Sequence, residues 1–244
     1  MIEVEKLSRA FGTLMAVNEV SFSVGEGELF GFLGPNGAGK TTTVNMLITL
    51  LRPTSGHARL AGLDIVKQAS DVRRAIGVIF QEPSLDERLT ALDNMRLHAF
   101  LYRVPGSERE KRIQDLLEMV GLTARRADTV KTFSGGMKRR LEIARGLLHK
   151  PKVLFLDEPT QGLDPQTRQH IWKYLGQLRS SQKTTILMTT HSMDEAERCD
   201  RVAIIDSGRI VELDTPRAIK ERHNVATMEE AFIEITGHEI RDGD

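Results

Sequence analysis

The motif Gly34-Pro-Asn-Gly-Ala-Gly-Lys-Thr41 places the strongest constraint on how this chain can fold. It follows the apolar segment 28–33 (ELFGFL) and precedes a segment, 40–51, whose composition favours a helix. The glycines let the backbone curl so that several N–H groups point inward and form a nest for anionic oxygens. A strand, a loop of the pattern G-x-x-x-x-G-K-[ST] and a helix, in that order, predict a phosphate-binding loop. A chance glycine-rich turn is the alternative, and the flanking strand and helix argue against it.

Individual side chains of this loop suit a metal-bound polyphosphate. The helix that begins at Lys40 adds the positive end of its dipole to the nest. Lys40 can reach the β- and γ-phosphates, the Thr41 hydroxyl can ligate Mg²⁺, and Thr42 can contact a phosphate oxygen. The loop therefore predicts a nucleotide with a magnesium ion as the ligand.

A second stretch, Phe133–Pro165, opens with Ser134, Gly135 and Gly136. Ser134 is a suitable N-cap, so one interpretation is simply the start of an amphipathic helix. Two consecutive glycines cost conformational entropy, and they favour a place where another group approaches the backbone closely. We therefore expect a second phosphate environment here, distinct from the first. The apolar face of the helix is predicted at Met137, Leu141, Ala144 and Leu148.

The same stretch contains the apolar segment Val153–Asp157, which ends in a carboxylate. At the carboxyl edge of a parallel sheet, beside the phosphate loop, Asp157 would be placed to hold Mg²⁺ through water. Glu158 comes next and could direct a carboxylate at the water that attacks the terminal phosphate. A solvated turn is the alternative, and the presence of a phosphate loop in the same chain disfavours it.

Composition excludes several classes of partner. Lys+Arg and Asp+Glu balance at 34 each, so a global basic field for nucleic acid is absent and no nucleic-acid partner is expected. Accordingly, Lys138, Arg139 and Arg140 are interpreted as a solvated helix face rather than as nucleic-acid contacts. Cys199 is the single cysteine, which rules out an internal disulfide and fits a reducing compartment. The sequence shows neither a secretory signal nor an apolar run of about 18 residues, so any membrane association is expected to go through a partner.

The order of the predicted elements indicates the fold class. Alternating apolar residues near the N-terminus suggest antiparallel strands, and two helical segments, 90–104 and 107–120, interrupt the chain before strands return. Strands separated by crossover helices favour a mostly parallel sheet. We expect an α/β P-loop NTPase in one domain, 1–244, with three parts. These are an α/β core at 1–82 and 149–222 with an antiparallel N-terminal β subdomain, an inserted helical subdomain at 83–148, and a short helical C-terminal extension at 223–244.

With GPNGAGKT, FSGGM, VLFLDEPTQGLD and the histidine of TTH, nearly the whole chain resembles the nucleotide-binding subunit of ATP-binding-cassette (ABC) transporters. The resemblance implies that ATP and Mg²⁺ are the ligands and that two copies of the chain form a dimer. It assigns Glu158 as the general base, and His191 as the residue that holds the γ-phosphate and orients Glu158. The metal-binding residues it implies are Thr41, Gln81 and Asp157. The nucleotide-binding residues it implies are Phe11, Gly34, Pro35, Asn36, Gly37, Ala38, Gly39, Lys40, Thr41, Thr42, Gln81, Ser134, Gly135, Gly136 and Asp164.

Some of these roles concern the partner subunit and the membrane. By resemblance, Ser134–Gly136 contact the ATP of the opposite subunit, Asp164 lies in a loop that communicates across the dimer, and Gln81 couples to the membrane subunit. The family motif usually begins with Leu and ends with Gln where Phe133 and Met137 stand here. This departure is similar to the drug-resistance, or ABC-2, exporter branch. The branch implies a separate integral membrane permease, with this subunit bound peripherally at the cytoplasmic side of the cell membrane.

Rival functions remain open at this point. One is a soluble ATPase switch in DNA repair or translation, although the long insertions of the first group and the paired cassettes of the second are missing here. Another is a non-transporting mechanotransmission module, whose ATPase core would look the same. The substrate cannot be read from this subunit, because the contacts that select it lie in the permease. The segment 227–242 is expected to form a helix that caps the core or the dimer.

Overall fold

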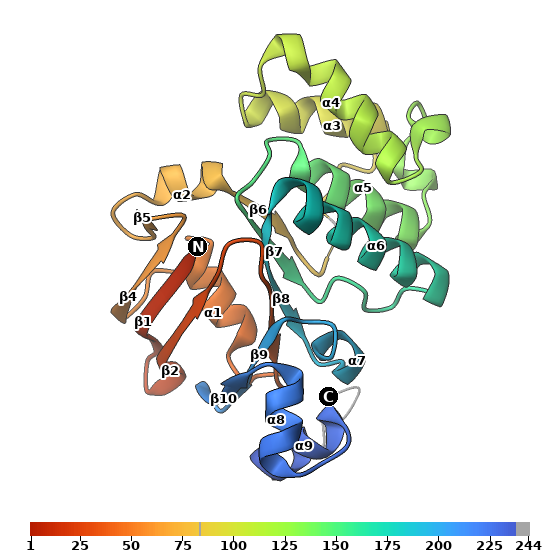
Figure 1. Cartoon of the computed structure of the whole chain (residues 1–244). Coiled ribbons are helices and arrows are strands. Elements are labelled where there is room, and N and C mark those ends of the chain that lie inside the picture. The colour runs from red at the N-terminus through yellow and green to blue at the C-terminus, as the bar shows by residue number, and fades with distance from the viewer. Residues whose placement is uncertain (83, 238–244) are drawn as a thin grey trace.

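The computed structural model describes residues 1–82 and 84–237 of the chain. Two β-sheets and the helices packed on them make up these residues (Figure 1). Residue 83, the first of the predicted helical subdomain, and residues 238–244 of the predicted C-terminal extension lie outside the described residues. Within 1–82 and 84–237, no helix combines the length and the apolar character needed to cross a bilayer.

The first sheet is antiparallel and is formed by the N-terminal part of the chain. Its strand order is β2-β1-β4-β5. Residues alternate between buried and exposed along β1 and β2, as expected for strands with one face on a core. The strands are β1 (Ile2–Phe11), β2 (Leu14–Val24), β4 (Ser55–Leu60) and β5 (Leu63–Asp64).

The second sheet has the order β10-β9-β3-β8-β7-β6 and is parallel except for β10, which pairs antiparallel with β9. Its central strands β3, β7 and β8 are buried almost throughout, because helices or the other sheet cover both of their faces. The predicted mostly parallel sheet is therefore confirmed. The strands are β3 (Leu29–Leu33), β6 (Ile76–Ile79), β7 (Val153–Asp157), β8 (Thr185–Thr190), β9 (Arg201–Asp206) and β10 (Arg209–Asp214).

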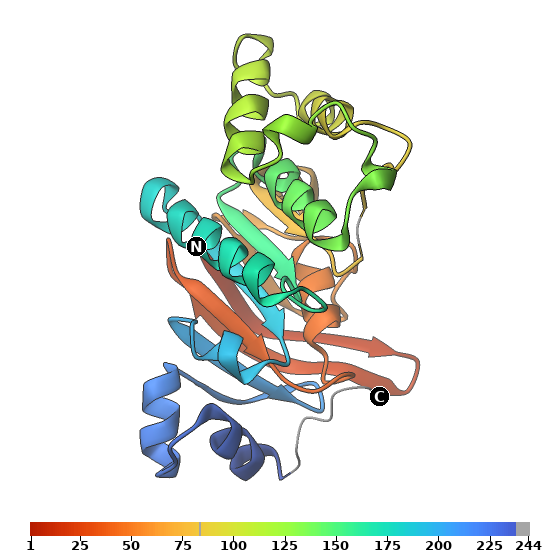
Figure 2. The ribbon, with the colours of Figure 1, turned by 90° about the vertical axis from the view of Figure 1, so that its right-hand side faces the viewer.

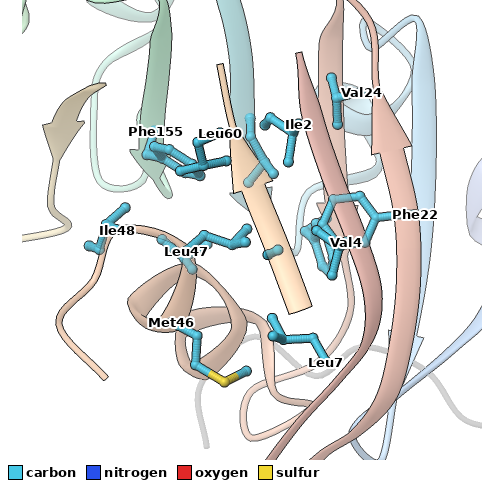
Figure 3. Packing of buried hydrophobic residues seen from close by; sticks show 14 of the residues in the cluster. Ile2, Val4, Leu7, Phe22, Val24, Met46, Leu47, Ile48, Leu60 and Phe155 are labelled. Atoms are coloured by element: carbon cyan, nitrogen blue, oxygen red, sulfur yellow. The ribbon is translucent and has the colours of Figure 1, made fainter. Parts of the chain in front are cut away.

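The space between the two sheets is filled by a hydrophobic cluster that includes helix α1 (Lys40–Leu47). Figure 3 shows Met46 of this helix near Leu7 of the antiparallel sheet, and Leu47 on the side of Leu60 and of Phe155 of β7. Helix α1 ends earlier than the predicted residue 51. Thr49 adopts a left-handed φ of 68°, and the N–H of Leu50 bonds back to the carbonyl of Asn45 at 2.9 Å, which is a Schellman-type helix end.

The opposite face of the parallel sheet packs against helices from the second half of the chain (Figure 2). Alternation along β7 divides its residues between the two cores, with Val153 and Phe155 on one side and Leu154 and Leu156 on the other. The helices on this side are α6 (Pro165–Gln182), α7 (Met193–Ala196), α8 (Pro216–His223) and α9 (Met228–Thr236). Helix α9 buries Met228, Ala231 and Phe232 in this core. The predicted capping helix is therefore confirmed over Met228–Thr236; it ends at Gly237, and the rest of the predicted segment, 238–242, lies outside the described residues.

A separate lobe of helices stands at the top of Figure 1 and has its own hydrophobic cluster. It comprises α3 (Ala91–Leu101), α4 (Gly106–Met119), two short 3₁₀ turns, η1 (Thr123–Arg125) and η2 (Val130–Thr132), and α5 (Gly135–Leu147). Helix α5 belongs to both the lobe and the core of the parallel sheet. Leu141 and Ala144, with Leu148 just after the helix, pack in the cluster of the lobe. Ile143 and Leu147 pack in the cluster of the parallel sheet. No counterpart of α2 (Ala69–Ala75), β5 or α8, nor of the turns η1 and η2, was predicted from the sequence.

Candidate functional site

The predicted phosphate loop connects β3 to the N-terminus of α1. Its curvature depends on glycine at two positions. Gly39 has φ 103°, and a Cβ on Gly34 would lie 2.3 Å from the carbonyl oxygen of Ile205. Gly39 also offers no side-chain cap, so no side chain at that position occupies the first N–H groups of the helix. The loop therefore presents the backbone donors that an anion requires.

Lys40 is buried at the base of this loop, and its Nζ donates to the carbonyls of Gly34 at 2.6 Å and Pro35 at 2.9 Å. Burial lowers the pKa of the Lys40 ammonium, and the negative charges of Glu158 and Asp157 act in the opposite direction. The structure thus brings the loop lysine within electrostatic reach of both predicted acids. Among the remaining loop residues, Asn36, Gly37 and Thr41 are exposed, Pro35 and Thr42 are half-buried, and Ala38 is buried.

The two acids occupy a strained turn at the carboxyl end of β7. Glu158 has a φ of 45°, a left-handed value that non-glycine residues seldom adopt. The hydroxyl of Thr189, on the adjacent strand β8, bridges the pair: it accepts from the Glu158 amide at 3.1 Å and donates to the Asp157 carboxylate. His191, just beyond β8, places its Nδ1 3.0 Å from Glu158 Oε1. The side chain of Glu158 is only 10% exposed, so its carboxylate is largely shielded from water.

Gln81, which follows β6, lies at the same turn. Its Nε2 donates to Gln161 Oε1 at 2.6 Å and approaches Glu158 Oε2 at 3.4 Å. Glu158 therefore has His191 at one carboxylate oxygen and Gln81 at the other. The structure brings together Lys40, Gln81, Asp157, Glu158 and His191, which come from four separate segments of the sequence.

Ser134, Gly135 and Gly136 form the N-terminus of α5, and the Ser134 hydroxyl caps the helix by accepting from the Met137 amide at 3.3 Å. A Cβ on Gly135 would meet no atom within 4 Å, whereas one on Gly136 would lie 3.0 Å from the Thr167 hydroxyl of α6. That first turn is exposed around Gly135, as a surface for an incoming group requires.

Asp164 caps helix α6 beside this segment. Its carboxylate accepts from the Thr167 hydroxyl at 2.6 Å and from the Thr167 amide at 2.9 Å, and these bonds, the hydroxyl first, lower the pKa of Asp164. Through Thr167, Asp164 lies next to Gly136. Helix α5 packs on α3, α4 and β6, while α1 packs on β2. The predicted site residues therefore fall into a phosphate-loop and acid group and a separate Ser134–Asp164 group.

Phe11 is the last residue of β1 and pairs with Leu14 of β2. Its ring is 44% exposed, and the guanidinium of Arg9 lies 4.5 Å from the ring centroid. An exposed π-face of this kind is available for stacking.

Sequence reasoning missed two buried charged residues near Glu158. Arg139, interpreted as part of a solvated face, is only 5% exposed, and it donates to backbone carbonyls instead of facing water. That interpretation was therefore wrong for Arg139. Glu195 of α7 is also buried, and its carboxylate accepts hydrogen bonds from the hydroxyls of Thr160 and Thr190. Glu195 thereby connects the segment that follows Glu158 with the end of β8, just before His191. The helical position of Arg139, two residues before the buried Leu141, gave no signal of its burial.

A phosphate loop between a parallel strand and a helix, with acids at the carboxyl end of a second strand of the same parallel sheet, defines the class of P-loop ATPases. Comparison with known proteins narrows this class. A family model described as "ABC transporter" matches residues 17–161. The chain belongs to the ABC transporter family, and it is an enzyme that binds and hydrolyses ATP.

Three curated relatives illustrate the similarity. The chain is 43% identical over 216 residues to the linearmycin resistance ATP-binding protein LnrL of Bacillus subtilis, covering 88% of this chain and 69% of that protein. It is 43% identical to the Nod factor export ATP-binding protein I of Ralstonia nicotianae, covering 90% of this chain and 68% of that one. It is 38% identical to YbhF of Escherichia coli, a probable multidrug ABC transporter ATP-binding protein, over 96% of this chain and 41% of YbhF.

Solved structures agree with this assignment. An ATP-binding subunit of an ABC transporter matches with a TM-score of 0.88 and 31% identity, over 96% of this chain and 99% of that one. The ATP-binding cassette MJ0796, in a dimeric post-hydrolysis state with ADP and phosphate, matches with a TM-score of 0.79 and 29% identity, over 88% of this chain and 98% of that one. The predicted fold class is thereby confirmed, and so is the resemblance stated from the sequence.

Proposed function

We propose that this chain is the ATP-hydrolysing subunit of an ABC-2 type exporter, driving export through a separate membrane permease. The observation that carries the ATPase half of this proposal is Glu158, whose shielded carboxylate lies between His191 and Gln81 beside the buried Lys40. The export half is supported by relatives named for resistance to linearmycin and for export of Nod factors. No relative above is named for translation or repair, so the soluble-switch alternative is not favoured.

In the proposed cycle, two copies of the chain enclose two ATP molecules. Each ATP has its phosphates on the Gly34–Thr42 loop of one subunit and its base against Phe11. The exposed turn Ser134–Gly136 of the other subunit completes the site. This division is supported by the open space around Gly135 and by the packing of α5 away from α1. It is also supported by the dimeric form of the similar cassette MJ0796. Asp164, linked to Gly136 through Thr167, would communicate between the two sites.

In the hydrolysis step, Glu158 would accept a proton from the attacking water while His191 keeps its carboxylate oriented and contacts the γ-phosphate. Lys40 would neutralise charge on the β- and γ-phosphates. Such phosphoryl transfer needs positioning and charge stabilisation more than covalent chemistry from the protein. The turn at Glu158 suits this because its carboxylate is already held at both oxygens.

The donor set of the site fits a magnesium ion. Thr41 offers a hydroxyl, Gln81 an amide oxygen and Asp157 a carboxylate, all hard oxygen donors of the kind that Mg²⁺ prefers alongside phosphates. Bound there, the ion would supply charge neutralisation between the phosphates. Asp157 is held for this task by the Thr189 hydroxyl.

A permease partner is supported by helix α3, the first helix after Gln81. It exposes three large apolar side chains, Leu97 at 48%, Phe100 at 68% and Leu101 at 65%. Apolar side chains grouped on one exposed helix mark a protein interaction site. Motion of the Gln81 segment would pass through this helix to the permease, and the chain would then lie at the cytoplasmic side of the membrane.

The base assignment is tested with Glu158→Gln. This variant should bind ATP, accumulate as a dimer on gel filtration with ATP, and lose turnover by on the order of 10³-fold or more. Near-normal hydrolysis would refute the role of Glu158.

The shared site is tested by mixing two inactive subunits in the Glu158→Gln background. Ser134→Arg blocks the contact offered to a partner, and Lys40→Ala removes ATP from the subunit that carries it. Neither variant should dimerise alone with ATP. Their mixture should form heterodimers holding one ATP, because the intact loop of the first meets the intact Ser134 segment of the second. If the mixture stays monomeric while both variants are folded and the parent dimerises, the site is not shared between subunits.

The permease is tested by affinity purification of the chain from detergent-solubilised membranes. An integral membrane protein should co-purify in stoichiometric amount. Replacing Phe100 and Leu101 with Ser should release it while ATP binding is retained. Recovery of ribosomal or DNA-bound partners instead would overturn the exporter proposal.

A further inference from the structure

Helix α5 carries a buried ionic network that the proposed cycle does not use. Arg139, Glu142 and Arg145 recur at intervals of three residues and therefore lie along one side of the helix. Arg139 is 5% and Glu142 2% exposed, and Glu142 lies 3.6 Å from each of the two guanidinium groups. Burying a charged side chain costs free energy unless it is paired and hydrogen-bonded. The hydrogen-bond partners of these three side chains therefore indicate what the network holds in place.

The guanidinium of Arg139 holds the turn that carries the proposed base. Its Nε donates to the carbonyl of Pro159 at 3.0 Å, and its Nη2 donates to those of Asp157 at 3.0 Å and Glu158 at 3.3 Å. Three consecutive carbonyls thus converge on one side chain. The remaining terminal nitrogen, Nη1, donates to the carbonyl of Phe80, the residue before Gln81.

This convergence coincides with backbone strain. Glu158, in the middle of the three residues, has the left-handed φ of 45°. Such a conformation persists only where its surroundings impose it. The Thr189 hydroxyl fixes the amide side of Glu158, and Arg139 fixes the carbonyl side. Arginine suits the second task because its donors form a rigid planar fork, which a lysine ammonium lacks.

The other two members of the network, Glu142 and Arg145, bind the backbone of Ser84 in the segment after Gln81. Glu142 Oε1 accepts from the Ser84 amide at 2.6 Å, and Arg145 Nη1 donates to the Ser84 carbonyl at 2.8 Å. One side of α5 therefore holds the chain on both sides of Gln81 as well as the turn at Glu158. The same helix begins at Ser134–Gly136.

From this geometry we infer that Arg139 is a positioning residue for ATP hydrolysis, which fixes the strained Asp157–Pro159 turn so that the Glu158 carboxylate points between His191 and Gln81. Through Arg139, a displacement of α5 at its Ser134 end changes the orientation of the base. The inference rests on the proposed role of Glu158 as the general base. It assigns Arg139 no contact with ATP or with the attacking water.

The test compares Arg139→Met with Arg140→Met in the full-length chain. Arg140 is the matched control, since it is the neighbouring arginine of α5 and donates to a carbonyl of the helical lobe, that of Val120. Arg139→Met should lower kcat on the order of 10²-fold, the cost of misplacing a reacting group by about 1 Å. Its Kd for ATP should stay within about twofold of the parent, while Arg140→Met keeps both values. Arg139→Lys should recover part of the lost kcat, because it keeps the charge and some of the donors.

A double variant separates positioning from general damage. If Arg139 acts through Glu158, then Arg139→Met combined with Glu158→Gln should hydrolyse ATP no more slowly than Glu158→Gln alone. Multiplied losses, an equal loss of ATP binding, or a normal kcat for Arg139→Met would each overturn the inference. If thermal melting shows that Arg139→Met is not folded, the test rests on Arg139→Lys. A normal kcat for Arg139→Lys would then overturn the inference. Normal hydrolysis by the single Glu158→Gln variant would instead refute the proposed base.

Discussion

The hydroxyl of Thr189 gives the most direct test of how the acid pair is held. Thr189 is fully buried, and its Oγ1 accepts from the Glu158 amide at 3.1 Å while donating to the Asp157 carboxylate. Thr189→Val keeps the shape of the side chain and removes both hydrogen bonds. The half-buried Glu158 amide and Asp157 carboxylate then lose a partner that valine cannot replace.

The magnitude follows from the two bonds. The neutral bond to the amide contributes about 1 kcal/mol, and the bond to the carboxylate about 1.5–3 kcal/mol. We expect a loss of about 2.5–4 kcal/mol in the free energy of unfolding, since the substitution opens no large cavity. For a chain of 244 residues this corresponds to a fall in Tm of roughly 5–15 °C. Turnover should fall by about tenfold or more, because the Glu158 turn loses its amide anchor.

Thr185→Val is the matched control at the other end of the same strand. The Thr185 hydroxyl also makes two bonds, accepting from the Gly27 amide at 3.0 Å and donating to the Gly25 carbonyl at 3.1 Å. Both are neutral, so its cost should be about 1–3 kcal/mol with kcat unchanged. Urea unfolding and ATPase assays of the two variants decide the matter. A Thr189→Val protein as stable and active as the parent, or equal loss of kcat in both variants, would refute the reasoning.

Three further substitutions test steric and electrostatic details. Gly34→Ala should destabilise the fold by about 1–3 kcal/mol and weaken ATP binding, because its Cβ would lie 2.3 Å from a carbonyl of β9; unchanged urea unfolding would contradict this close packing. Gly135→Ala meets open space, so monomer stability should be equal or slightly higher while ATP-driven dimerisation falls; normal dimerisation would argue against close approach there. Hydrogen bonds to Glu234 and Glu212 raise the pKa of His223, so this contact stabilises the fold fully below pH ~6.5 and is lost as pH rises through the raised pKa. The parent should therefore lose up to about 1 kcal/mol more than His223→Gln between pH 6 and 8.5 in thermal melts, and identical pH profiles would exclude the effect.

Local chemistry explains what the sequence could predict. The loop at Gly34–Thr41 needs glycine for its backbone angles and lysine for its charge, so residue types and spacing reveal it directly. Strands such as Val153–Asp157 were recognisable because a strand covered on both faces is continuously apolar. The antiparallel and parallel sheets and the helical block were therefore accessible from pattern alone.

Long-range contacts explain what it could not. Arg139 lies 20 residues from Pro159 and 59 from Phe80, and nothing in its own segment marks those carbonyls as its partners. The helical face predicted for α5 was incomplete for a similar reason. It contained Leu141, Ala144 and Leu148, which face the lobe, but the helix has a second apolar face that a search for one stripe does not reveal. Helix α8 is polar over most of its length and lacked any periodic apolar signal.

Those two apolar faces of α5 have a consequence for how the chain unfolds. The helical lobe and the nucleotide-binding core are not independent cooperative units, because α5 supplies side chains to the hydrophobic clusters of both. Loss of the lobe would expose Ile143 and Leu147 and so uncover part of the core beside β7. Native-state hydrogen exchange should then show amides of β7 opening together with those of α5, while amides of β1 and β2 open separately. A movement of the lobe in the proposed cycle would thus alter the local stability of the strand that carries Asp157.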